Sequence, residues 1–65
     1  MNKGEFGKSR VIAQQVGGEL LSDIREYFHL YSGRSCLDGD FTADELRRIA
    51  AAMDEINTRL AQEGL

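Results

Sequence analysis

The stretch LDGDFTADEL, residues 37–46, contains the start of a helix. If Thr42 is the N-cap, Glu45 is the third helical residue. The two then form a capping box, in which each side chain accepts a hydrogen bond from the backbone N–H of the other residue. Asp44 adds negative charge in the first turn, where the helix dipole favours it. We therefore predict that a helix begins at Ala43.

The same stretch resembles the second half of an EF-hand calcium loop, because an Asp-Gly pair is followed by a hydrophobic residue and a glutamate. In that register Glu45 is the bidentate ligand, but Arg34 and Cys36 stand at the first and third ligand positions. A cation therefore replaces a carboxylate, and we expect no calcium site. Cys36 and His29, the single cysteine and histidine, have no neighbour at zinc-ligand spacing. We predict no metal and no cofactor.

Apolar residues recur at alternating spacings of three and four after this helix start. Such heptad spacing is typical of a helix that packs in a coiled-coil-like contact. We expect the helix to cover residues 43–63 and to stop at Gly64. The core positions on this helix are Leu46, Ile49, Met53, Ile56 and Leu60.

A first helix is predicted over residues 9–31, after a flexible N-terminal tail over residues 1–8. Its apolar residues cover roughly 180° of the helical wheel, which is too wide for one neighbouring helix. Gly17 and Gly18 each weaken the helix by roughly 1 kcal/mol relative to alanine. The apolar face continues in phase across them, which favours one helix over two. The core positions on this helix are Val16, Leu20 and Ile24.

Two helices joined by a loop over residues 32–41 predict an all-α fold, an antiparallel two-helix hairpin that forms a single domain over residues 9–65. A chain of 65 residues buries a small core. The surplus apolar face of the first helix then predicts a homodimer that forms a four-helix bundle. The alternative is that this face binds a different protein. The predicted architecture resembles that of the Rop-type RNA-binding hairpin dimers, although no sequence motif carries the likeness.

Charge and hydropathy exclude several classes of protein. Eleven acids against eight bases give a net charge of −3, so the chain lacks the broad cationic field of non-specific nucleic-acid binding. The uninterrupted apolar runs are far too short to span a bilayer. We therefore predict a cytoplasmic protein that does not interact with a membrane. We also predict no enzymatic activity, because one small helical hairpin offers no concave pocket.

The aromatic residues near the end of the predicted first helix indicate a binding function. Aromatic side chains supply many of the hot spots of protein interfaces, and an apolar helix face can dock into a groove of a partner. We predict a small regulator, an inhibitor or adaptor, of the size of phage-encoded and toxin-neutralising proteins. It binds a larger protein target through Tyr27, Phe28, Leu30 and Tyr31. The alternative for the aromatic residues is that they close the end of the core.

The basic residues near the N-terminus leave a second function open. Lys3, Lys8 and Arg10 make this end of the chain cationic although the whole chain is acidic. A basic arm of this kind can contact a phosphate backbone. The alternative prediction is a small nucleic-acid-binding regulator.

Overall fold

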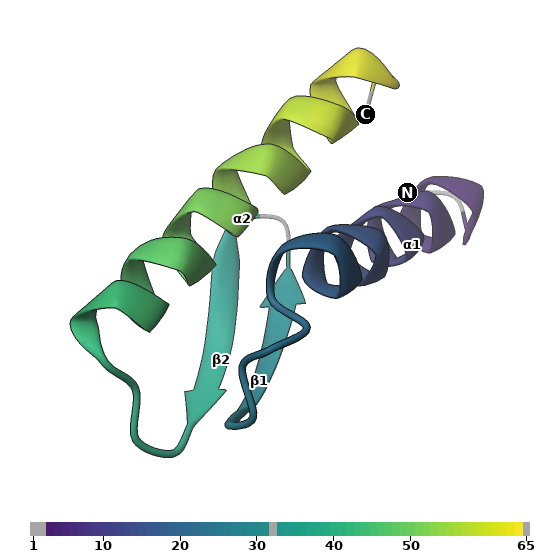
Figure 1. Cartoon of the computed structure of the whole chain (residues 1–65). Helices are drawn as coiled ribbons and strands as arrows, with labels where there is room; N and C mark the ends of the chain where they lie inside the picture. Colours follow the sequence, from purple (N-terminus) through teal and green to yellow (C-terminus); the bar gives the residue numbers. More distant parts are fainter. Residues whose placement is uncertain (1–2, 32, 65) are drawn as a thin grey trace.

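The fold places a two-stranded antiparallel β-hairpin between two α-helices in the chain order (Figure 1). The computed structural model describes the backbone of residues 3–31 and 33–64, and the side chains of residues 7–31 and 33–64. The two helices pack on each other, and β1 packs against both of them. The elements are α1 (Lys3–Leu20), β1 (Tyr27–Tyr31), β2 (Arg34–Asp38) and α2 (Ala43–Gln62).

The prediction of an all-α two-helix hairpin is wrong, and the fold is α+β. The predicted first helix stops at Leu20, and the segment Tyr27–Tyr31 near its predicted end is a strand. Aromatic residues favour strands, and the side chains of YFHLY alternate between exposed and half-buried, as strand geometry requires. Ser22 and Asp23 lie in the connection, where short polar side chains favour turns over helix. The predicted coiled coil and four-helix bundle are wrong for the same reason.

Helix α1 continues without a break through Gly17 and Gly18. A Cβ atom on Gly17 would lie 3.4 Å from Cδ1 of Leu30, which is an ordinary van der Waals contact, so β1 packs directly against the helix at this position. The helix begins at Lys3, inside the segment predicted as a tail, whose residues 1 and 2 lie outside the described residues. After its last residue, the N–H of Leu21 donates to the carbonyl oxygen of Gly17 over 2.9 Å.

The predicted start of α2 is confirmed. The backbone N–H of Glu45 donates to Oγ1 of Thr42 over 3.1 Å, and the N–H of Thr42 donates to Oε1 of Glu45 over 2.8 Å. At the other end, Gly64 has a φ of +78°, a conformation that favours glycine, and its N–H donates to the carbonyl of Ala61 over 3.1 Å. Local sequence therefore sets both ends of this helix.

Replacing Thr42 by alanine is expected to lower the free energy of unfolding by about 1 kcal/mol, because the side-chain half of the capping box is lost. Urea denaturation followed by circular dichroism measures the change. Thr58→Ala is the matched control: the Thr58 hydroxyl donates only to the carbonyl of Asp54, inside α2, so its removal should leave stability nearly unchanged. Equal stabilities of the two variants would show that the capping box contributes nothing.

The core lies between the two helices and is closed by β1. Phe28, Leu30, Phe41 and Met53 are partly buried and pack against it. The hairpin covers apolar surface for which a second copy of the chain was expected. The homodimer stays a prediction, but Tyr27–Tyr31, which was part of the helix face that motivated it, is a strand. The buried residues are Ile12, Ala13, Val16, Leu21, Ile24, Ile49, Ala52, Ile56 and Leu60.

Most of the predicted core residues are buried, and two are not. Leu20 and Leu46 are each 43% exposed. Leu20 is the last residue of α1, and Leu21 beside it is only 1% exposed. Met53 is partly buried against the core. The other five lie in the core: Val16, Ile24, Ile49, Ile56 and Leu60.

Two arginines of α2 hold the C-terminal end of α1 and the turn that follows it. The guanidinium of Arg48 donates to both carboxylate oxygens of Asp23, over 2.6 and 2.9 Å, and to the carbonyl of Leu20 over 2.8 Å. Arg59 donates to Glu19 over 2.7 Å and to Glu55 over 3.0 Å. Hydrogen bonds from Arg48 lower the pKa of Asp23 to about 2, and those from Arg59 lower the pKa of Glu19.

These shifts predict a loss of stability in acid. The pKa of Asp23 falls from 3.8 to about 2 on folding. The free energy of unfolding that ionised Asp23 contributes is therefore fully present above pH about 4 and is lost as the pH falls to about 2. We expect Asp23→Asn to lower the melting temperature at neutral pH. Between pH about 4 and about 2, the melting temperature of this variant should then fall less than that of wild type. Asp54→Asn, an exposed carboxylate outside the ion pairs, should keep the wild-type acid response. Identical acid profiles for wild type and Asp23→Asn would rule out this ion pair as a source of stability.

Candidate functional site

The outward face of the β-hairpin gathers polar and aromatic side chains. In the antiparallel register Tyr27 pairs with Asp38, His29 with Cys36, and Tyr31 with Arg34. Directly paired residues point to the same side of a sheet, and alternate residues along a strand share a face. We call this surface the aromatic face. It consists of Tyr27, His29, Tyr31, Arg34, Cys36 and Asp38.

A tight turn fixes which residues share this face. Only two residues separate Tyr31 from its partner Arg34. Gly33, one of the two, has a φ of +84°, which is favourable for glycine and strained for other residues. A slip of one residue in the register would move every side chain of a strand to the other face. The turn therefore determines the composition of the aromatic face.

The three rings of β1 form a row of mutual contacts. The rings of Tyr27 and His29 meet edge to face, with centroids 4.9 Å apart, and the Tyr27 hydroxyl is hydrogen-bonded to Nε2 of His29. The rings of His29 and Tyr31 have centroids 6.3 Å apart. The guanidinium carbon of Arg34 lies 5.6 Å from the centroid of the Tyr31 ring, within the range of a cation–π contact. Neighbouring side chains thus restrain each ring, although Tyr27 remains 57% and Tyr31 43% exposed.

The structure separates the four predicted partner-binding residues into two pairs. Tyr27 and Tyr31 point outward on the aromatic face, whereas Phe28 and Leu30 are on the opposite side of β1 and pack against the core. His29 completes the outward row and was missed from sequence. The sequence feature that could have placed His29 there is the strict alternation of YFHLY, in which every second residue carries a polar ring.

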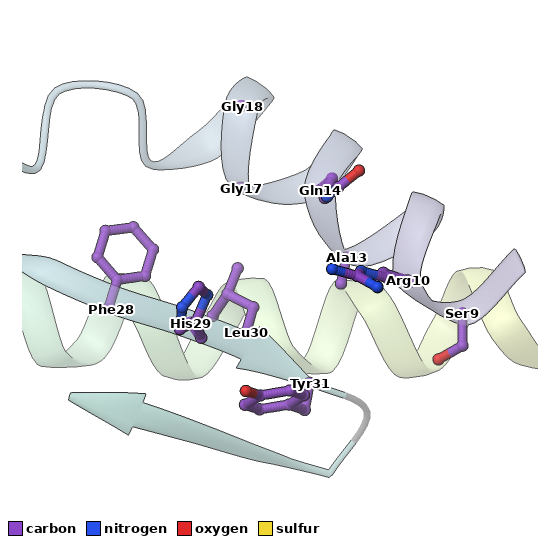
Figure 2. A pocket seen from close by; sticks show the side chains of 10 residues that line it. All are labelled: Ser9, Arg10, Ala13, Gln14, Gly17, Gly18, Phe28, His29, Leu30 and Tyr31. Carbon is purple, nitrogen blue, oxygen red and sulfur yellow. The ribbon is translucent and has the colours of Figure 1, made fainter. Parts of the chain in front are cut away.

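A groove lies between α1 and β1 (Figure 2). Its volume is about 590 Å³, which is within the range of ligand-binding clefts. The expectation that the chain offers no concave surface is therefore wrong. We call this feature the α1–β1 groove. It is lined by Ser9, Arg10, Ala13, Gln14, Gly17 and Gly18 of α1 and by Phe28, His29, Leu30 and Tyr31 of β1.

The side chains of the aromatic face can stack, donate hydrogen bonds and bind ions of either sign. Cys36 is exposed and stands opposite His29, but the contacts of the His29 ring are with Tyr27 and Tyr31. Among the side chains of residues 7–31 and 33–64, no three His, Cys, Asp or Glu are grouped to hold a metal ion.

Comparisons of the chain with protein-family models, with curated proteins and with solved structures find no match. Neither helix, in the part of the chain that the structure describes, combines the length and apolar character needed to cross a membrane. The functional argument therefore depends on the aromatic face and the α1–β1 groove.

Proposed function

We propose that the protein is a small non-enzymatic regulator that binds a larger protein through its aromatic face, as an inhibitor or an adaptor. The observation that carries the proposal is the exposed row of Tyr27, His29 and Tyr31 on β1, with Arg34 against its end. Tyrosine and arginine are enriched in protein interfaces and among their hot spots. The binding of a larger protein, which the sequence predicts for a helix face, is therefore assigned in this proposal to the outward face of the β-hairpin.

Two physical features favour tight docking on this face. The rings already contact one another, so little side-chain freedom remains to be lost on binding. The face also carries a positive charge at one end, from Arg34, and a negative charge at the other, from Asp38 opposite Tyr27. Charges placed in this way can orient a partner of complementary charge.

The test compares tagged wild-type protein with a Tyr27→Ala/Tyr31→Ala variant as baits in extract of the source cell, at moderate and high salt. We expect wild type to retain one protein at both salt concentrations and the variant to lose it. Val11→Ala is the control, because Val11 is an exposed apolar residue of α1 outside the aromatic face. A retained protein that is unaffected by loss of the two tyrosines would contradict the proposal, as would the absence of any protein specific to wild type.

Nucleic-acid binding is a second candidate, favoured by one observation. Exposed aromatic residues on a sheet surface are what single-stranded nucleic acids stack on, and Arg34 adds a cation there. Lys3, Lys8 and Arg10, predicted as a basic arm, are part of α1. Binding of a labelled single-stranded oligonucleotide that weakens steeply with salt and is lost in the Tyr27→Ala/Tyr31→Ala variant would favour this candidate over a protein partner.

A further inference from the structure

The outer edge of β1 has unpaired backbone groups. Because the hairpin closes with two residues between Tyr31 and Arg34, this pair exchanges hydrogen bonds, and so does every second pair away from the turn. The N–H and C=O groups of Phe28 and Leu30 therefore point away from β2. Among the described residues, the backbone hydrogen bonds outside the helices and the hairpin occur only at helix ends and in the turn after α1. None of them uses this edge.

The α1–β1 groove gives this edge a binding wall. Helix α1 lies on the side of β1 that faces away from β2 (Figures 1 and 2). Gly18 lines the groove, and a Cβ atom placed on it would have nothing within 4 Å. An extended segment placed along β1 would contact both a strand edge and a helix face.

The charge of the groove defines the chemistry of the segment. The chain is acidic overall, yet none of the described side chains that line the groove is acidic. Arg10 lies near the Tyr31 end of the groove in Figure 2. The ion pairs of the described residues involve Arg48 and Arg59 and leave Arg10 without one. A carboxylate at this end would therefore gain a cation that has no ion pair within the described part of the chain.

We infer that the α1–β1 groove binds an extended peptide segment as a third strand of the sheet, with an acidic side chain of the peptide on Arg10. Main-chain hydrogen bonds to Phe28 and Leu30 supply affinity, as in other cases of strand addition. Arg10 fixes the direction and favours acidic sequences. The groove shares His29 and Tyr31 with the aromatic face, but this site adds the backbone edge of β1 and the side chains of α1, so it goes beyond docking on that face.

The probe is a displayed library of random seven-residue peptides, selected against wild type and two variants. Wild type should enrich peptides with an acidic residue and few prolines, because proline lacks the N–H that strand pairing needs. Gly18→Trp places a large ring in the groove and should enrich none of them. Gly7→Trp is the control, since Gly7 is also an open position of α1 but does not line the groove. Arg10→Glu should weaken the selected peptides by about tenfold or more.

Amide hydrogen exchange tests the binding mode on one selected peptide. In the free protein the N–H groups of His29 and Tyr31 should exchange slowly and those of Phe28 and Leu30 rapidly. The peptide should protect Phe28 and Leu30, and Tyr27→Ala should leave this protection unchanged, which separates this site from the aromatic face.

Three results would overturn the inference. They are the failure of wild type to enrich any peptide above Gly18→Trp, binding without new protection of Phe28 and Leu30, and protection of these amides that rises with protein concentration in the absence of peptide. The last result would identify a second copy of the chain as the occupant of the edge.

Discussion

The Ile56→Asp variant is expected to be unfolded at room temperature. Ile56 is fully buried in α2 and faces the core that α1 and β1 complete. The substitution removes an apolar side chain and buries a carboxylate with no partner, which costs several kcal/mol even after the pKa of the new group adjusts. A small domain has a free energy of unfolding of about 5 to 15 kcal/mol, and 65 residues bury proportionally less surface than larger chains. Far-ultraviolet circular dichroism and the spread of amide resonances measure the loss.

Ala51→Asp is the matched control for this substitution. Ala51 lies in the same helix but is exposed, so the new carboxylate stays in water and the cost is limited to helix propensity, less than about 1 kcal/mol. The control should keep the wild-type spectrum. An Ile56→Asp variant with wild-type amide dispersion would mean that Ile56 is not in the core of the folded protein.

Helix α2 was predictable because its determinants are local. The capping box depends on Thr42 and Glu45, three residues apart, and the stop depends on Gly64. The heptad spacing placed Ile49, Ile56 and Leu60 in the core, where they lie. Interactions between near neighbours in the chain are visible in the sequence, whatever the rest of the fold does.

The hairpin was not predicted, because the residues of β1 fit both the helical period of 3.6 residues and the strand period of two residues. Phe28 and Leu30 continue the apolar arc of the helix before them, and they also alternate with the outward Tyr27, His29 and Tyr31. A short apolar run cannot be assigned by periodicity alone. The deciding interaction is the pairing of β1 with β2, which is a contact between two segments and not a property of either one. The aromatic face and the α1–β1 groove follow from that pairing, so neither was predictable.

The end of α1 also shows that periodicity alone cannot decide which residue enters the core. Both Leu20 and Leu21 fit the apolar arc of a long helix, and the sequence pattern predicts Leu20 for the core. Because the helix ends at Leu20 and the chain turns there, with the N–H of Ile24 donating to the carbonyl of Leu21 over 3.1 Å, the next leucine enters the core instead. Leu20 stays 43% exposed, and Leu21 is 1% exposed.

Leu21→Ala is therefore expected to lower the free energy of unfolding by about 2 to 5 kcal/mol, since it removes a buried side chain and leaves a cavity. Leu20→Ala is the control one residue away, with an expected loss of less than about 1 kcal/mol. Urea denaturation of both variants gives the two values on one scale. If Leu20→Ala is the more damaging substitution, the helix does not end where the structure places its end, and the hairpin that follows is misplaced with it. A larger loss for Leu21→Ala supports the exposures that the structure gives the two leucines, and with them the turn that begins after Leu20.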